Sequence, residues 1–335
     1  MNWNGLYGRP QLINILQSAI SEGKTAHACL LYGPKGIGKK TVARAYATAL
    51  NCQNPSLGTC GECVSCRKAA SGAHPDIHWI VPDGKSIKIE QIRNVKKSAF
   101  LRPHEGRFQI FILDGADLLT KEAANSLLKV LEEPPPASIF ILLAENPSSL
   151  LPTVASRCLL FALPRLDRQS MKSILSDAGL ASSAEETVRV LDLAEGIPGR
   201  ALALAGRSDW HSSFLEGKRL LASLYKGDAP DAHATRLAEK ENLEDELDMI
   251  LFVLRDLLMM QTARSQELIT CAGEAELLRE LLDKWPATAT VQAIEAILKL
   301  QRDMRSPVNV RLALERALRR LKEVLTDADS CGYTL

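Results

Sequence analysis

The clearest indication of the fold is the motif Gly33-Pro34-Lys35-Gly36-Ile37-Gly38-Lys39-Lys40-Thr41. It follows a short apolar run, residues 28–32, and precedes a helix-forming segment, residues 41–50. Strand, glycine-rich loop and helix in this order are the setting of a phosphate-binding loop. Backbone N–H groups of such a loop turn toward phosphate oxygens, and the helix N-terminus adds partial positive charge. The candidate phosphate-binding residues are Gly33, Gly36, Gly38, Lys39 and Thr41.

Two positions tied to hydrolysis depart from the pattern of an active ATPase. The motif expects Ser or Thr, as a magnesium ligand, directly after the lysine, and this chain has Lys40. An apolar strand over residues 107–113 ends at Asp114, the Walker B pattern in which the carboxylate helps to hold Mg²⁺. The glutamate that usually follows, and that orients the attacking water, is replaced by Gly115. We therefore expect no hydrolysis here, and the sequence leaves open whether ATP or ADP still binds.

Four of the eight cysteines are clustered just after the phosphate-loop helix, with the spacing Cys52-x7-Cys60-x2-Cys63-x2-Cys66. Four thiolates at short spacing can close a tetrahedral Zn²⁺ site, and such a site leaves no coordination position open for chemistry. The alternatives are reduced surface thiols or a disulfide. The spacing favours a structural zinc module over residues 52–66.

Strands and helices alternate in the first half of the chain, which predicts an α/β P-loop domain with a parallel sheet and helices on both faces. The predicted helices include residues 87–101 and 116–133. After residue 164 the pattern is helical only. We expect a P-loop core over residues 1–164, a small helical lid over 165–207, and an all-α domain over 208–335 that packs into a bundle or an oligomer interface.

Charge and hydrophobicity limit which partners the chain can bind. The 335-residue chain has a net charge of +1, so nucleic-acid contact would need a local basic patch. Residues 85–107 hold seven basic and two acidic residues, and this segment is either a solvated face or a DNA-backbone patch that includes Arg93, Lys96 and Lys97. Residues 1–10 lack a basic region followed by an apolar run, so we expect no signal peptide. The longest strongly apolar stretch, residues 249–254, is too short to span a membrane. We expect a cytoplasmic protein that does not enter a membrane.

Further motifs follow in a fixed order along the chain: Ala123–Pro135 (AANSLLKVLEEPP), Ser156-Arg157-Cys158, a Gly-x-x-x-Arg motif that ends at Arg200, and Asn309–Glu315 (NVRLALE). Together with the phosphate loop and the four-cysteine insertion, this order resembles the bacterial clamp-loader subunits of DNA polymerase III, in the AAA+ superfamily. The resemblance covers nearly the whole chain. Gamma/tau subunits keep Gly-Lys-Thr/Ser and Asp-Glu, whereas this chain has Gly-Lys-Lys and Asp-Gly, so it is more similar to the delta prime branch.

This resemblance implies a non-hydrolysing subunit of a hetero-pentamer with gamma/tau and delta, joined by a collar that the last domain helps to form. It also implies a role in loading the ring-shaped sliding clamp onto primed DNA during replication. Arg157 resembles an arginine finger that acts in trans on a neighbouring ATPase. Arg200 resembles the lid arginine of active relatives, although a salt-bridge role fits it as well. Two alternatives remain: an active gamma/tau-like ATPase in which Thr41 replaces the metal ligand, and a stand-alone zinc-containing DNA-binding protein.

Overall fold

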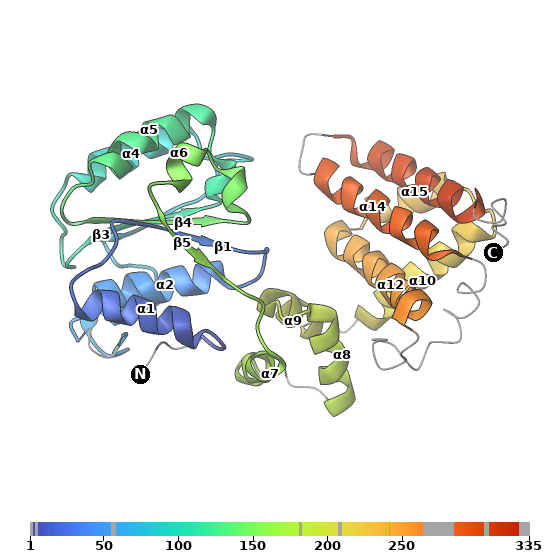
Figure 1. Cartoon of the computed structure of the whole chain (residues 1–335), viewed down its shortest axis with the longest axis horizontal. Coiled ribbons are helices and arrows are strands. Elements are labelled where there is room, and N and C mark those ends of the chain that lie inside the picture. The colour runs from blue at the N-terminus through green and yellow to red at the C-terminus, as the bar shows by residue number, and fades with distance from the viewer. Residues whose placement is uncertain are drawn as a thin grey trace. The chain divides into compact units, whose positions relative to one another are not determined.

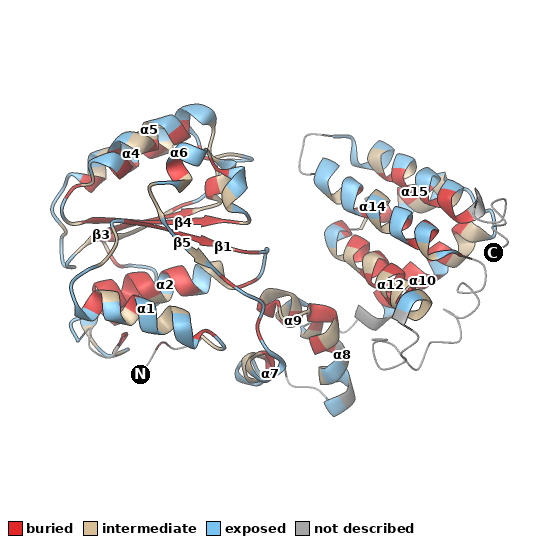
Figure 2. Ribbon diagram, in the orientation of Figure 1, coloured by how far each residue is buried: buried red, intermediate tan, exposed pale blue. Residues whose placement is uncertain are grey.

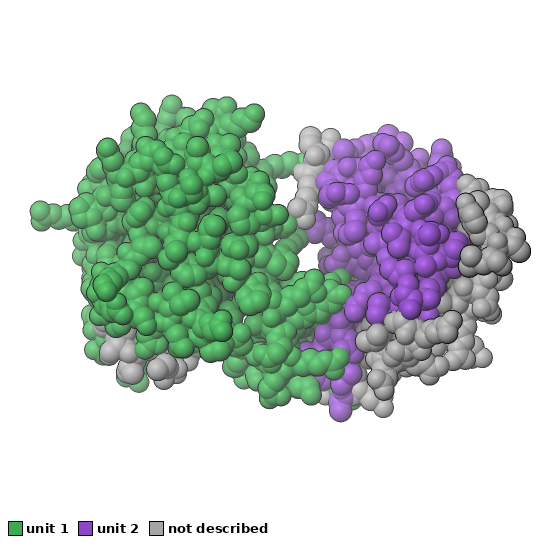
Figure 3. Space-filling view, in the orientation of Figure 1, with its two compact units in different colours: residues 1–183, 194–205 green, residues 184–193, 206–335 purple. Residues whose placement is uncertain are grey.

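The computed structural model describes residues 3, 6–54, 58–180, 183–206, 210–240, 242–263, 285–304 and 308–327. Two compact units make up the chain, residues 1–183 with 194–205 and residues 184–193 with 206–335 (Figure 3). The division into three domains stays a prediction. No helix in the described ranges is long and apolar enough to cross a membrane.

The first unit alternates strands and helices. In chain order they are α1 (Pro10–Ser21), β1 (Ala28–Tyr32), α2 (Lys39–Leu50), α3 (Val64–Ala70), β2 (Ile77–Ile80), α4 (Ile89–Ala99), β3 (Gln109–Asp114), η2 (Ala116–Leu118), α5 (Lys121–Glu132), β4 (Ser138–Ala144), η3 (Pro147–Ser149), α6 (Pro152–Ala155), β5 (Leu159–Ala162), α7 (Arg168–Asp177) and α9 (Pro198–Ala205).

The strands form one five-stranded parallel sheet in the order β2-β3-β4-β1-β5. Leu30 of β1 pairs with Leu142 of β4, and Ile112 of β3 pairs with Ile141 of β4. Every residue of β4 is buried, as Figure 2 shows for the strands at the centre of the sheet. Burial on both faces explains the continuous apolar run of this strand. The predicted α/β fold with a parallel sheet is confirmed.

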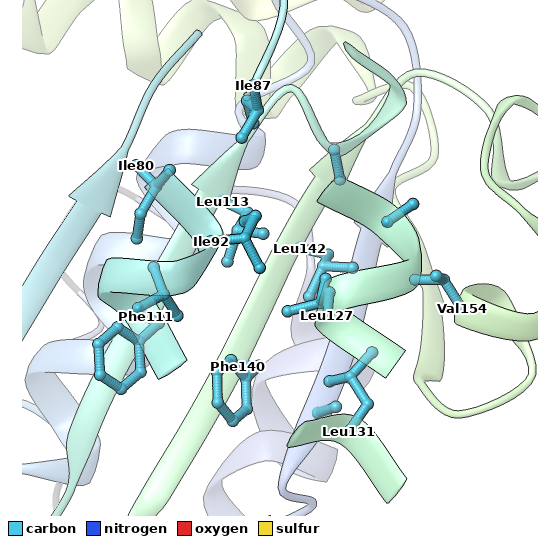
Figure 4. Packing of buried hydrophobic residues seen from close by; sticks show 14 of the residues in the cluster. Ile80, Ile87, Ile92, Phe111, Leu113, Leu127, Leu131, Phe140, Leu142 and Val154 are labelled. Carbon is cyan, nitrogen blue, oxygen red and sulfur yellow. The ribbon is translucent and has the colours of Figure 1, made fainter. Parts of the chain in front are cut away.

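Helices cover both faces of the sheet: α1 and α2 lie on one face, and α4, α5 and α6 on the other (Figure 1). Successive side chains of a strand point to opposite faces. Phe111 and Leu113 therefore join the core under α4 and α5, while Ile110 and Ile112 join the core over α1 and α2. Figure 4 shows the first of these clusters, in which Phe111 and Phe140 stack with ring centroids 5.4 Å apart.

The prediction of one helix over residues 116–133 is wrong. The chain forms the short 3₁₀ helix η2, and α5 begins only at Lys121. The Thr120 hydroxyl accepts a hydrogen bond from the Ala123 N–H at 3.2 Å and caps α5. The Thr120 N–H donates to the Ile87 carbonyl oxygen, which holds this residue out of any preceding helix. The sequence pattern also gave no indication of α3, which begins inside the cysteine segment and ends at Ala70.

The second unit is helical, as predicted. It contains most of α8 (Ala184–Ala194), together with α10 (Trp210–Tyr225), α11 (Pro230–Ala238), α12 (Leu243–Ala263), α14 (Ala287–Asp303) and α15 (Val310–Asp327). α14 packs against α12 and α15, and α10 packs against the same two helices. Phe214, Leu254 and Leu318 are among its fully buried side chains. Apolar residues at helical spacing therefore build a separate core.

Candidate functional site

The phosphate loop lies between β1 and α2, as the sequence predicts. Gly36 and Gly38 have φ angles of 82° and 99°, a left-handed conformation that glycine adopts without steric strain. The Lys39 ammonium donates to the carbonyl oxygens of Gly33 and Pro34, at 2.6 and 3.1 Å. Burial lowers the pKa of Lys39. The lysine is therefore held against carbonyl groups of its own loop.

Lys40 and Asp114 form an ion pair. Asp114 ends β3, and its Oδ2 atom lies 2.6 Å from the Lys40 ammonium. The Asp114 side chain is only 16% exposed, whereas that of Lys40 is 68% exposed. A magnesium site at this position needs oxygen ligands, and here the carboxylate already has a cationic partner and the expected hydroxyl is missing. These residues do not fit Mg²⁺.

Gly115 has a backbone conformation that disfavours the usual glutamate. Its φ angle is 90°, in the left-handed region that costs an L-residue with a side chain roughly 1–2 kcal/mol. A Cβ atom here would also lie 3.2 Å from Cδ1 of Leu118. The backbone after Asp114 is therefore shaped for glycine.

The helix α9 packs directly on the phosphate loop. The Gly199 N–H donates to the Gly36 carbonyl oxygen at 2.9 Å. A Cβ atom on Gly199 would lie 2.8 Å from the Gly36 Cα atom, closer than side-chain atoms pack, so glycine is required for this contact. Arg200 is in the first turn of α9, and its backbone nitrogen lies 3.6 Å from the Cβ position of Gly36. The structure thus brings the predicted lid arginine beside the loop, through a glycine contact that the sequence did not predict.

Arg9 is a buried residue beside the loop that no sequence motif indicated. Its guanidinium donates to the carbonyl oxygens of Ile37 and Pro164, and burial lowers its pKa. Arg9 and Thr41 line a cavity of about 320 Å³, whose remaining wall is largely apolar. The available signal was weak, an arginine followed by the proline that begins α1.

Arg157 lies between α6 and β5, away from the loop in sequence. Its Nη2 atom is 2.6 Å from Oε1 of Glu132, at the end of α5. Its Nη1 atom donates to the Thr153 carbonyl oxygen at 2.8 Å. The Arg157 side chain is 35% exposed and that of Glu132 is 47% exposed. The sequence singled out Arg157 but gave no indication of Glu132.

The four clustered cysteines come together in space. The ligand atoms of Cys52, Cys60, Cys63 and Cys66 all lie within 4.8 Å of one another. The sulfur atoms of Cys60 and Cys66 are 3.9 Å apart, and those of Cys66 and Cys52 are 3.6 Å apart. Zn–S bonds of about 2.3 Å in a tetrahedron place sulfurs about 3.8 Å apart. The cluster could hold a metal ion.

Hydrogen bonds to sulfur support this arrangement. The Cys63 N–H donates to the Cys60 sulfur, and the Cys66 N–H donates to the Cys63 sulfur, each at 3.4 Å. Burial would raise the pKa of the Cys63 thiol, but hydrogen bonds outweigh it and lower that pKa to about 6. Burial raises the pKa of Cys66. A metal ion would be needed to hold all four as thiolates.

Arg93, Lys96 and Lys97 of the basic segment lie on α4. Arg93 pairs with Glu90 on the same helix at 2.7 Å, Lys97 is exposed and Lys96 is half-buried. Two further cations of this segment and its surroundings are also paired, Lys88 with Asp83 and Lys68 with Glu105. Part of the positive charge is therefore balanced locally, and Lys96 and Lys97 are the cations of this helix for which the structure gives no ion pair within its described residues.

A buried carboxylate near the cysteine module orders the loop before β3. Asp76 is fully buried and accepts hydrogen bonds from the N–H groups of His104, Glu105 and Gly106, at 2.6, 2.9 and 2.7 Å. Burial alone would raise its pKa, but these hydrogen bonds outweigh burial and lower it. The loop that connects α4 to β3 is therefore fastened to Asp76, a role that spacing in the sequence did not reveal.

Two family models match the chain, one in each unit. The family model described as DNA polymerase III, delta subunit, matches residues 8–167. The model of the C-terminal part of the delta subunit matches residues 219–323. Among solved structures, a DNA polymerase III gamma subunit-related protein from Thermotoga maritima aligns over 92% of this chain and 98% of its own, at 18% identity with a TM-score of 0.47.

Curated relatives match over most of the chain. DNA polymerase III subunit delta' of Bacillus subtilis is 29% identical over 94% of this chain and 96% of its own length. The subunit delta' of Pseudomonas aeruginosa is 33% identical over 83% of this chain and 85% of its own length. Subunit tau of Bacillus subtilis is 30% identical over 93% of this chain, which matches 60% of that longer protein. The chain therefore belongs to the bacterial DNA polymerase III clamp-loader delta' family.

Proposed function

We propose that this chain is a non-hydrolysing subunit of the DNA polymerase III clamp loader. The observation that carries the proposal is the ion pair between Lys40 and Asp114, 2.6 Å long. In an active relative, the corresponding carboxylate helps to hold Mg²⁺ against the nucleotide phosphates. Here the Lys40 ammonium pairs with that carboxylate. Gly115, which follows it, cannot orient water because it has no side chain. Nucleotide contacts by Gly33, Lys39 and Arg200 stay a prediction.

We assign Arg157 the role of an arginine finger that acts on a neighbouring ATPase subunit. A guanidinium supplied in trans stabilises the charge of the phosphoryl group in transfer, and such a finger contributes about 10³–10⁵ in rate. Partial exposure of Arg157 beside β5 supports this role, because a finger must reach another molecule. The chain would thus lack turnover of its own and complete the site of its neighbour.

The proposed partners follow from the family. Gamma/tau and delta subunits would complete a hetero-pentamer, with the helical unit of this chain in its collar, and the assembly would load the sliding clamp onto primed DNA in the cytoplasm. Arg93, Lys96 and Lys97 are the proposed contacts to the DNA backbone. Zn²⁺ is the metal that we propose for the cysteine cluster, because four thiolates at tetrahedral spacing match its preference. Its role would be structural.

The test compares the isolated chain with the reconstituted assembly. We expect no ATP turnover by the isolated chain, and a sharp loss of DNA-stimulated ATPase when Arg157→Ala replaces the wild-type chain in the assembly. The active gamma/tau-like reading is favoured by the intact loop glycines and Lys39, and it predicts turnover by the isolated chain that Lys39→Ala abolishes. An assembly ATPase that Arg157→Ala leaves unchanged would refute the finger.

A further inference from the structure

The guanidinium of Arg157 is already paired within its own chain. Glu132 Oε1 lies 2.6 Å from Nη2, and the Thr153 carbonyl oxygen accepts from Nη1 at 2.8 Å. We propose that Glu132 is a positioning residue that holds Arg157 back, because it competes with the phosphate groups of the neighbouring subunit's nucleotide for the guanidinium. This inference rests on the proposed function, in which Arg157 acts in trans.

The packing of two helices fixes the pair. Glu132 is the last residue of α5, whose Leu127 and Leu131 are buried in the core on that face of the sheet. Val154 of α6 enters the same core, and α6 leads directly to Arg157. The core therefore holds the backbones of α5 and α6 in place, and this brings the side chains of Glu132 and Arg157 within reach of each other.

The strength of the pair suits an exchange of partners. Both side chains are partly exposed, and ion pairs of this kind shift an equilibrium by no more than about fivefold. Arginine binds phosphate through the same donors that it uses for a carboxylate, and a nucleotide triphosphate carries more negative charge than one glutamate. The phosphate can therefore displace Glu132. While Glu132 stays at the guanidinium, it cancels the positive charge that would stabilise the phosphoryl group.

The test is Glu132→Gln in the reconstituted assembly. Glutamine keeps the size of the side chain and removes its charge, so the competitor is lost while the fold is kept. We expect the apparent KM for ATP to fall about two- to fivefold, with kcat unchanged, because saturating ATP engages Arg157 in both proteins. The difference between the two proteins should shrink as salt screens the pair.

Glu133→Gln is the matched control. Glu133 is the adjacent residue, is also exposed, and makes no ion pair with any residue that the structure describes. This variant should keep the wild-type KM, which separates loss of the Arg157 pair from a general loss of negative charge.

Arg157→Ala, measured alongside, separates the two ways of failing. If Arg157→Ala leaves the ATPase of the assembly unchanged, the finger is refuted and this inference with it. If Arg157→Ala lowers the ATPase while Glu132→Gln leaves KM unchanged or raises it, the finger stands and Glu132 is not a competitor. A KM that falls equally in Glu133→Gln also overturns the inference.

Discussion

The Lys40 ammonium lies 2.6 Å from the Asp114 carboxylate, so the phosphate loop and the end of β3 are joined by an ion pair within the chain. Lys40 departs from the phosphate-loop motif of an ATPase, whereas Asp114 keeps the carboxylate of the Walker B motif. Together they form a contact between a positive and a negative group at the place where active relatives bring a carboxylate to Mg²⁺. The contact neutralises the carboxylate without any metal ion.

The first prediction concerns the metal dependence of nucleotide binding. Lys40→Thr removes the ammonium and restores a hydroxyl, so the variant should bind ATP about tenfold more tightly with Mg²⁺ than with EDTA, an effect of the size of one hydrogen bond to a charged group. The wild-type chain should show no such dependence in isothermal titration. Lys24→Thr is the matched control, because Lys24 is also an exposed lysine paired with a carboxylate, at 2.9 Å. Binding by the wild-type chain that requires Mg²⁺ would contradict the argument.

The second prediction concerns Gly115. Gly115→Glu places a side chain at a φ angle of 90°, and we expect the free energy of unfolding to fall by roughly 1–2 kcal/mol. Gly115→Ala should lose a similar amount, because the strain arises from the Cβ atom rather than the charge. The double variant Lys40→Thr/Gly115→Glu should remain without turnover. Urea unfolding and an ATPase assay check these outcomes, and full hydrolysis by the double variant would show that the backbone does not limit the site.

The third prediction concerns the cysteine cluster. Purified protein should contain about one zinc per chain, and Cys60→Ser/Cys63→Ser should lose it, because two of the four thiolate ligands are removed. Cys158→Ser changes a half-buried cysteine outside the cluster and should keep the metal. Elemental analysis by mass spectrometry measures the content. Folded wild-type protein that carries no zinc would refute this assignment.

The fourth prediction is a pH dependence at Asp76. The pKa of this carboxyl is lower in the folded chain than in the unfolded chain, so its ionised form stabilises the fold. That contribution is present above the unfolded pKa, about 3.9, and is lost as pH falls through the folded value. Asp76→Asn should lower the free energy of unfolding by about 1–3 kcal/mol at neutral pH, and the difference from wild type should shrink below about pH 4.

Asp83→Asn is the control for Asp76, because the Asp83 side chain is 66% exposed and its ion pair contributes little. Urea unfolding across the pH range gives the comparison, and hydrogen exchange at the amides of His104, Glu105 and Gly106 reports the local effect. Equal stability of Asp76→Asn and wild type at neutral pH would mean that these hydrogen bonds do not hold the loop.

The amino-acid sequence by itself indicates the sheet, the phosphate loop and the cysteine cluster. The apolar runs of β1 and β4 and the glycines of the loop indicate a parallel sheet with a phosphate loop, because such strands are buried on both faces. The spacing of Cys60, Cys63 and Cys66 indicates a metal site, because ligands close in sequence can meet around one ion. The order of the motifs indicates the family. The sequence was less informative about where helices begin and end. The helical pattern before α5 is interrupted at Thr120, whose N–H donates to the carbonyl oxygen of Ile87, a residue far from it in sequence.

Which of these residues meet depends on the tertiary structure. Sheet order brings the end of β3 beside the phosphate loop, so that Lys40 reaches Asp114. Packing of α5 against α6 brings Glu132 to Arg157, and the close approach of α9 sets Gly199 on Gly36. Sequence spacing carries no information about such pairs, because their distance depends on how strands are ordered and how helices pack. The motifs predict a silent ATPase site, and the contact between Lys40 and Asp114 is the observation that supports this proposal.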